Sequence, residues 1–213
     1  MESYRRTFIE LALAHEALRF GEFTLKSGRK SPYFFNAGQF YTGDALKTLG
    51  ECYASAISHS NLSYDIIFGP AYKGIPLACA CSIALSSQFQ HDVRYCFNRK
   101  EAKDHGEGGL MVGAPLKGRV LIIDDVVTAG TAIRESLQII SEANAQVAGI
   151  VVALDRQEKG QAELSAIQEI EKTMNIPVIS IITFSHIMAY VENEPQFRAF
   201  REPMQAYRQQ YGA

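Results

Sequence analysis

The clearest chemical signal in the sequence is the stretch VLIIDDVVTAGTAIRES at residues 120–136. Two adjacent carboxylates, Asp124 and Asp125, end an apolar run, and they repel each other and resist burial unless something polar or cationic lies beside them. The small residues from Thr128 to Thr131 let the backbone wrap closely around a ligand at the start of a helix. Their N–H groups, the helix dipole and two hydroxyls suit a phosphate.

Carboxylates beside a phosphate would repel it unless they accept hydrogen bonds from sugar hydroxyls or face a hydrated cation such as Mg²⁺. A ribose phosphate bound with Mg²⁺ satisfies both halves of the stretch. An apolar strand followed by two aspartates also occurs in Walker B segments and in receiver domains. The sequence contains no GxxxxGK[ST] motif, and two strands precede the pair, whereas a receiver domain has its acidic pair near the start of its sheet. Both alternatives are therefore disfavoured.

Two further segments combine glycines with cations. In GPAYKG, at residues 69–74, Lys73 supplies an ammonium at a strand end, and we expect Gly69 and Gly74 to adopt backbone geometry closed to other residues. NRKEAKDHGEGG, at residues 98–109, combines three glycines with four potential cations: Arg99, Lys100, Lys103 and His105. Such a loop could close over a polyanion and exclude water. The alternative for GPAYKG is a tight surface turn. The alternative for NRKEAKDHGEGG is an exposed, charged hairpin loop.

The elements around these segments alternate between strand-like and helical runs. We expect strands at 65–70, 93–97, 119–124, 146–154 and 177–184. We expect helices at 4–20, at 44–58 with Asp44 as the cap, and at 74–87, 129–143 and 161–174, a hairpin at 23–38, and helical packing beyond 187. Apolar strands alternating with helices predict an α/β fold with a parallel sheet covered on both faces. Ligands bind such sheets beyond the carboxyl ends of the strands.

Composition limits the other classes of function. A chain of 213 residues with 47% hydrophobic content is expected to fill one domain, and its net charge of -2 gives no general attraction to nucleic acid or to a membrane. The four cysteines lack metal-site spacing and are expected to be reduced, mostly buried thiols. Charged residues interrupt the N-terminal apolar run, so we expect neither a signal peptide nor a membrane span, and a cytoplasmic protein.

The stretch at 120–136 resembles the signature with which type I phosphoribosyltransferases bind the ribose 5-phosphate part of phosphoribosyl diphosphate (PRPP). With the segments at 23–38, 69–78 and 98–109, the similarity extends over essentially the whole chain, and within the family it points to the members that act on orotate. The resemblance implies the type I phosphoribosyltransferase fold: a central, mostly parallel sheet with helices on both faces, in one domain spanning 1–213. It also implies a hood formed by residues 1–43 and a mobile catalytic loop at 98–110.

The same resemblance implies transfer of the phosphoribosyl group to orotate, giving orotidine 5'-phosphate and diphosphate for UMP synthesis. Mg²⁺ is the implied cofactor, bound mainly through substrate and water near Asp124 and Asp125, and the implied assembly is a homodimer that shares the catalytic loop. The implied catalytic residues are Lys103, His105, Asp124 and Asp125. The implied PRPP-binding residues are Lys26, Tyr72, Lys73, Arg99, Lys100, Lys103, His105, Asp124, Asp125, Val126, Val127, Thr128, Ala129, Gly130, Thr131 and Ala132.

The implied orotate-binding residues are Phe34, Phe35, Thr128 and Arg156. Neighbouring phenylalanines in a strand point to opposite faces, so one ring can stack on a flat pyrimidine while the other packs in the core. The guanidinium of Arg156, at a strand end, can bind a carboxylate bidentately and so distinguish orotate from uracil. A salt bridge with Asp155 or Glu158 is the alternative for Arg156.

Two other activities fit the same resemblance. A purine or uracil phosphoribosyltransferase is disfavoured by the base pocket expected around Phe34, Phe35 and Arg156. A PRPP-sensing regulatory protein would need a nucleic-acid surface, and the sequence has neither an added helix-turn-helix segment nor an excess of basic residues.

Overall fold

The computed structural model describes residues 1–25, 27–103, 109–127, 131–160 and 163–213. Its main sheet has six strands: β3 (Ile66–Gly69), β4 (Arg94–Lys103), β5 (Gly109–Gly113), β6 (Arg119–Val126), β7 (Gln146–Asp155) and β8 (Val178–Thr183). The spatial order is β5-β4-β3-β6-β7-β8, and every neighbouring pair is parallel except β4 with β5. The predicted mostly parallel sheet is confirmed.

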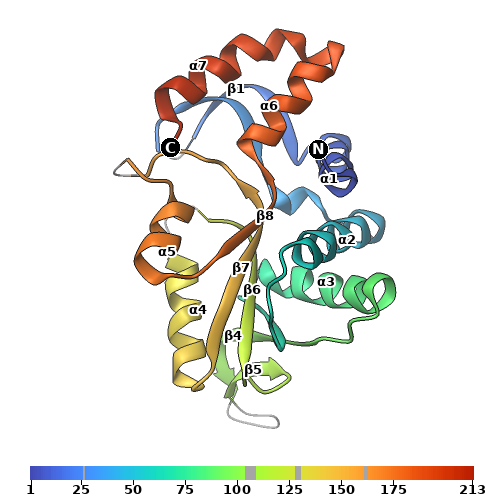
Figure 1. The fold of residues 1–213 in the computed structure, drawn as a ribbon, viewed down its shortest axis with the longest axis vertical. Helices are drawn as coiled ribbons and strands as arrows, with labels where there is room; N and C mark the ends of the chain where they lie inside the picture. Colours follow the sequence, from blue (N-terminus) through green and yellow to red (C-terminus); the bar gives the residue numbers. More distant parts are fainter. Residues whose placement is uncertain (26, 104–108, 128–130, 161–162) are drawn as a thin grey trace.

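Helices cover both faces of this sheet, as the sequence predicted (Figure 1). Helices α2 (Gly43–His59) and α3 (Gly74–Phe89) lie on one face, and α4 (Thr131–Glu142) and α5 (Ala166–Met174) lie on the other. Helix α1 (Ser3–Ala14) packs beside α2. Among the residues that the structure describes, no helix is both long enough and apolar enough to cross a membrane.

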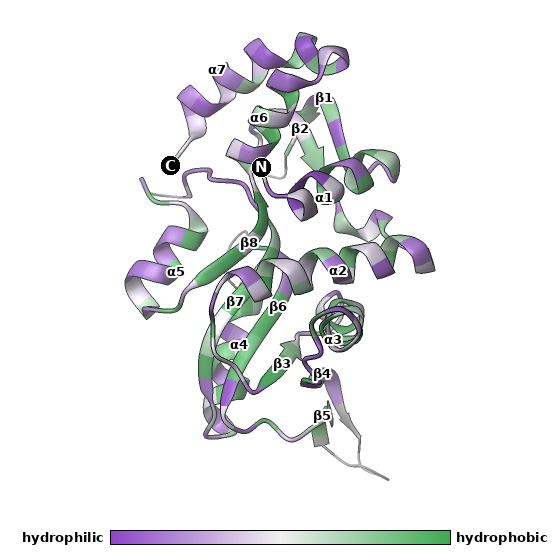
Figure 2. Ribbon diagram, turned by 45° about the vertical axis from the view of Figure 1, so that its right-hand side comes forward, coloured by the Kyte–Doolittle hydropathy of each residue, from purple (hydrophilic) through white to green (hydrophobic). Residues whose placement is uncertain are grey.

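The strands are apolar on both faces because both faces are covered (Figure 2). Alternate residues of β6 join different cores: Leu121 and Ile123 pack with α1, α2 and α3, whereas Val120 and Ile122 pack with α4 and α5. This division follows the two-residue period of a strand. All four cysteines are free, and Cys52, Cys81 and Cys96 are buried, as expected for most of them.

The N-terminal hairpin forms a small second sheet from β1 (Leu18–Thr24) and β2 (Lys30–Phe35). It lies beside α6 (Phe184–Asn193) and α7 (Arg201–Tyr211), at the end of the molecule far from β5 (Figure 1). Short 3-10 turns occupy Ala37–Gln39 and Pro195–Phe200. The ring of Phe20 packs between those of Phe197 and Phe200, with centroids 5.2 Å away in each case. Aromatic contacts therefore hold the hairpin against the C-terminal helices.

Several predicted boundaries were wrong. The first helix ends at Ala14 rather than near Phe20, because Glu16 takes a left-handed φ of 55° and the chain then turns into β1. Helix α2 is capped by the hydroxyl of Thr42, which accepts a hydrogen bond from the N–H of Ala45, and Asp44 lies in the first turn instead. Strand β4 continues to Lys103, where a loop was expected from residue 98. Its partner β5 was not predicted, because charged and glycine-rich residues surround it.

Candidate active site

The loops singled out in the sequence follow β3, β4, β6 and β7, which are adjacent parallel strands. The structure brings three of these loops together through side-chain contacts. Lys73, after β3, places its Nζ 2.6 Å from Asp125 Oδ2, at the end of β6. Asn98 Oδ1, in β4, accepts a hydrogen bond of 2.8 Å from the N–H of Ala71. Side chains from these loops therefore form one cluster at the carboxyl edge of the sheet.

The two adjacent aspartates are both nearly buried, with Asp124 8% and Asp125 6% exposed. Asp124 Oδ1 accepts the N–H of Asp125, and Asp125 Oδ1 accepts the N–H of Val126, each over 2.9 Å. The hydroxyl of Tyr53 donates to the carbonyl of Asp124 over 2.8 Å. The pKa of Asp124 is raised to about 6, mainly by burial and secondly by the negative charge of Asp125. Such a pair is a strong acceptor of hydrogen bonds from hydroxyls or hydrated cations.

Two residues of this cluster, Tyr53 and Asn98, were not predicted from the sequence. Tyr53 lies inside α2 and is fully buried, and no local pattern marks a tyrosine in a helix as a contact of a distant strand. Asn98 is the first residue of the cation-rich segment and is 8% exposed. The signal in the sequence was its uncharged amide beside charged residues.

Lys73 and Tyr72 reach outward from the loop after β3. The side chain of Lys73 is 62% exposed despite its ion pair, and Tyr72 is 70% exposed. The peptide bond between Ala71 and Tyr72 is cis. Both side chains are accessible to a ligand at this edge, as expected for PRPP contacts.

The two glycines of this loop are required for a different reason from the one predicted. Neither Gly69 nor Gly74 has a positive φ. Instead, the end of β3 and the start of α3 approach so closely that a Cβ on Gly69 would lie 2.2 Å from the carbonyl oxygen of Gly74. A Cβ on Gly74 would lie 2.7 Å from Cδ of Pro70. Close approach of backbones, rather than unusual dihedral angles, excludes larger residues here.

Other expected PRPP-binding residues surround this cluster. Lys100 Nζ lies 3.3 Å from Glu135 Oε2 of α4, and Arg99 is half-buried in the same strand. Thr131 and Ala132 are exposed in the first turn of α4, while Val126 and Val127 are half-buried. Lys26, His105, Thr128, Ala129 and Gly130 lie outside the described residues, as does the side chain of Lys103, whose backbone ends β4.

The two phenylalanines expected at the orotate site separate as predicted. The ring of Phe35 packs toward the main core, 6.1 Å from Phe8 and 6.5 Å from Phe40 between centroids. Phe34 instead lies 5.6 Å from Phe23, with the guanidinium of Arg19 over its ring. Phe35 is therefore bound to the core, and Phe34 belongs to the outer face of the hairpin.

Arg156 follows β7 and forms the ion pair with Glu158 that the sequence left open as its alternative role. Its Nε donates to Glu158 Oε1 over 3.0 Å, and its Nη2 lies 2.7 Å from the same oxygen. Its guanidinium carbon lies 4.6 Å from the centroid of the Tyr33 ring. Since Val126 pairs with Leu154, Arg156 follows β7 just beyond the level of the acidic pair. The ion pair does not exclude a substrate, because a guanidinium has more than one edge.

The residues fit a metal held mainly through substrate and water. Asp124 and Asp125 offer the carboxylate oxygens that Mg²⁺ prefers. Within the described ranges, however, no group of three or more histidine, cysteine, aspartate or glutamate side chains could hold a metal ion by itself. The two carboxylates would contact such a cation through its water shell.

A comparison with protein families gives the class to which this fold and site belong. The model described as "Phosphoribosyl transferase domain" matches residues 36–180, which include β3 to β7 and the acidic pair. By its fold and by this match, the chain is a phosphoribosyltransferase.

Individual relatives narrow this class. The chain is 59% identical over 212 residues to orotate phosphoribosyltransferase of Cellvibrio japonicus, covering 100% of this chain and 99% of the relative. It is 60% identical over 214 residues to that of Stutzerimonas stutzeri, covering both chains fully. The crystal structure of orotate phosphoribosyltransferase from Francisella tularensis superposes with a TM-score of 0.88 at 48% identity, over 97% of this chain and 99% of that one. The chain belongs to the orotate phosphoribosyltransferase family.

Proposed function

We propose that this chain transfers the phosphoribosyl group of PRPP to orotate, giving orotidine 5'-phosphate and diphosphate in the synthesis of UMP. The observation that carries the proposal is the contact between Lys73 and the buried Asp124–Asp125 pair, at the strand ends that precede α4. Cation, carboxylates and helix start together suit the diphosphate, hydroxyls and 5-phosphate of one substrate.

Catalysis is expected to act on the leaving diphosphate, where negative charge grows as the bond to C1 breaks. Five cationic side chains would bind this charge. Three belong to the described residues, Lys73, Arg99 and Lys100, and the other two are those of Lys103 and His105. C1 becomes oxocarbenium-like, and the ring nitrogen of orotate attacks from the opposite face and inverts the anomeric centre. No nucleophilic side chain is needed.

The carboxylates of Asp124 and Asp125 would accept hydrogen bonds from the ribose hydroxyls or from water around the cofactor. Mg²⁺, when bound, supplies positive charge to the diphosphate and to the ribose hydroxyls. The phosphate of the ribose would bind at the start of α4, where Thr131 and Ala132 are exposed. This division assigns the sugar to β6 and the 5-phosphate to the following helix.

The acceptor would lie between the hairpin and the end of β7. Arg156 would bind the carboxylate of orotate, and Phe34 and Thr128 would line the ring, while Phe35 packs toward the main core. Residues 1–43 would act as the hood over this site. The charge of Arg156 gives the preference for orotate over uracil, which lacks the carboxylate.

A homodimer is the assembly that we propose, with the loop at 98–110 shared between subunits. Large apolar side chains are exposed on neighbouring elements near the β5 edge of the sheet: Tyr72 before α3, Ile83 in α3, Tyr95 in β4 and Leu110 in β5. Exposed apolar groups on neighbouring elements favour burial against a second chain. A sedimentation mass of one chain at micromolar concentration would contradict this assembly.

The free, buried thiols suit a reducing compartment, and we propose the cytoplasm.

The function is tested by mixing the protein with PRPP, Mg²⁺ and orotate and following the loss of orotate absorbance. Parallel reactions replace orotate with uracil, adenine, guanine or hypoxanthine. Turnover of orotate alone is the expected result. Turnover of a purine or of uracil in its place would overturn the proposal, as would tight nucleic-acid binding by a protein that turns over no base.

A further inference from the structure

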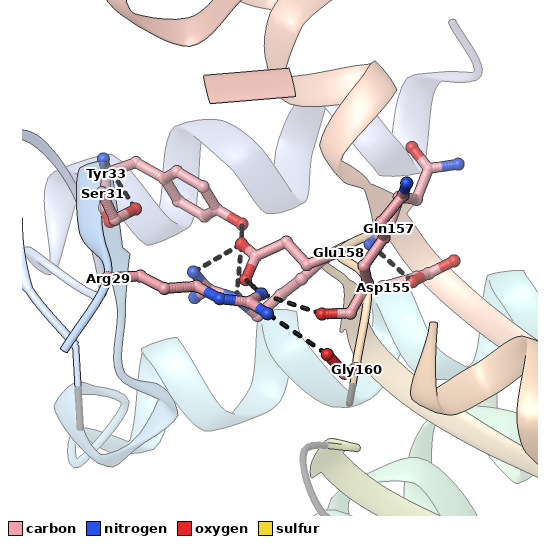
Figure 3. A network of polar contacts seen from close by, with 9 residues as sticks. Arg29, Ser31, Tyr33, Asp155, Gln157, Glu158 and Gly160 are labelled. Atoms are coloured by element: carbon pink, nitrogen blue, oxygen red, sulfur yellow. Dashed lines mark hydrogen bonds and ion pairs between the residues drawn. The ribbon is translucent and has the colours of Figure 1, made fainter. Parts of the chain in front are cut away.

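Glu158 joins the two elements that carry the proposed orotate-binding residues. Tyr33, in the strand that continues to Phe34 and Phe35, donates its hydroxyl hydrogen to Glu158 Oε1 over 3.1 Å. Arg156 Nε donates to the same oxygen over 3.0 Å. One carboxylate oxygen therefore connects β2 to the end of β7, although the two segments are more than 100 residues apart in sequence (Figure 3).

These contacts restrict the guanidinium of Arg156. One of its edges faces Glu158, with Nη2 2.7 Å from Oε1 as an ion pair that lacks hydrogen-bond geometry. One of its flat faces lies on the ring of Tyr33, which is fully buried. Arginine has a large rotamer entropy, so a guanidinium that is already oriented loses less freedom when it binds a carboxylate. The side chain of Arg156 keeps 17% of its surface exposed, so it is not sealed inside.

The group formed by Arg29, Arg156 and Glu158 keeps a net positive charge. Arg29 Nη1 lies 4.0 Å from the other oxygen of Glu158, Oε2, and donates a hydrogen bond to the carbonyl of Lys159. Two guanidiniums and one carboxylate carry a formal charge of about +1. Glu158 can therefore orient Arg156 without cancelling the attraction of the cluster for an anionic substrate.

The backbone around Glu158 is held by contacts that do not involve its side chain. Gln157 Oε1 accepts hydrogen bonds from the N–H and the hydroxyl of Ser185, over 3.0 and 2.6 Å. Glu158 forms a β-bridge with Gly212, and the N–H of Lys159 donates to the carbonyl of Tyr211 over 2.8 Å. A change of the Glu158 side chain should therefore leave the position of this loop intact.

We propose that Glu158 is a positioning residue for the acceptor substrate, and this inference rests on the proposed function. It orients Arg156 so that the guanidinium edge not held by Glu158 meets the carboxylate of orotate. Through Tyr33, it also keeps that guanidinium in register with the strand that carries Phe34 and Phe35. Loss of Glu158 should weaken the use of orotate while leaving the use of PRPP nearly unchanged.

The test compares steady-state kinetics of Glu158→Ala, Glu158→Gln and Tyr33→Phe with the unsubstituted protein. Glu158→Ala removes the acceptor, and we expect the KM for orotate to rise about tenfold, with the KM for PRPP changed less than about twofold. Glu158→Gln keeps an acceptor oxygen and should restore most of the loss. Tyr33→Phe keeps the ring under Arg156 and removes only the hydroxyl, so a rise of about threefold is expected. Glu163→Gln, which breaks an exposed pair with Lys159, is the matched control and should change neither constant.

Four outcomes overturn the inference. They are an unchanged orotate KM in Glu158→Ala, a lower orotate KM in Glu158→Gln, equal increases of both KM values, and no orotate turnover by the unsubstituted protein. The last also overturns the proposed function, whereas the first three leave it standing. If circular dichroism shows that Glu158→Ala is unfolded, the orotate KM values of Glu158→Gln and Tyr33→Phe decide the question in the same way.

Discussion

Lys73 Nζ and Asp125 Oδ2 lie 2.6 Å apart and join the loop after β3 to the end of β6. The pair is asymmetric, because the lysine side chain is 62% exposed and the aspartate side chain 8%. The carboxylate depends on this contact more than the ammonium does, since a buried charge needs a partner. The exposed ammonium is the part of this pair that an incoming ligand can reach.

Substitution Lys73→Ala should lower kcat/KM for PRPP by about two or three decades, because a cation is lost beside the proposed leaving group. Lys73→Arg keeps the charge and should lose less. Initial rates at varied PRPP and saturating orotate measure both effects. A Lys73→Ala protein with kcat/KM within threefold of the unsubstituted value would remove Lys73 from the site.

Lys103 is expected to act on the transition state rather than on binding. Strand β4 ends at Lys103, whose backbone pairs with Gly109 of β5. The residue therefore lies in the cation-rich segment, at the end of the strand. Lys103→Ala should lower kcat by about two decades or more, while the KM for PRPP changes less than threefold. Lys117→Ala, in an exposed segment between β5 and β6, is the control and should behave as the unsubstituted protein. An unchanged turnover number would exclude Lys103 from the mechanism.

Gly69 should tolerate no side chain, because an added Cβ would collide with the carbonyl oxygen of Gly74 at 2.2 Å. We expect Gly69→Ala to destabilise the protein by about 1–3 kcal/mol, the usual cost of overpacking, and to lower activity by displacing Lys73. Gly43→Ala is the matched control, since nothing lies within 4 Å of its added Cβ at the start of α2. Thermal unfolding of the two variants measures the contrast. Equal melting temperatures would contradict the close-approach explanation.

The sequence predicted the main sheet well because its strands are buried on both faces and read as apolar runs. Asp124 and Asp125 could be placed for the same reason, since they end such a run and the edge of a parallel sheet is the ligand edge. Strand β5 was missed because it lies at the edge of the sheet, beside a charged segment. Edge strands lack the apolar signal that marks buried ones.

The contacts that position the site were not predictable from local patterns. The hydroxyl of Tyr53 reaches Asp124 from inside a helix, and Glu158 meets Tyr33 across most of the chain. Such pairs depend on how the hairpin and helices pack, which the spacing of residues does not encode. The role of Gly69 was assigned to its dihedral angles for the same reason, since the neighbouring backbone is visible only in the folded chain.

Asp124 should make stability depend on pH. Burial and then the charge of Asp125 raise its pKa to about 6, above the value of about 3.9 expected in the unfolded chain. Between these two values the folded protein holds a proton that the unfolded chain has released, so stability falls as pH rises through this window. The full cost is present above pH 6 and is on the order of 3 kcal/mol.

Asp124→Asn removes the charge but keeps an oxygen that can accept the N–H of Asp125. We therefore expect this variant to melt about 6–12 °C higher than the unsubstituted protein at pH 7.5. The difference should shrink at pH 4.5, where folded Asp124 is protonated. Turnover should fall most at pH 7.5, where Asp124 is ionised and the ribose hydroxyls lose an anionic acceptor. Asp92→Asn, at an exposed position, should show no such pH-dependent gain. Equal or lower stability of Asp124→Asn at pH 7.5 would contradict the raised pKa.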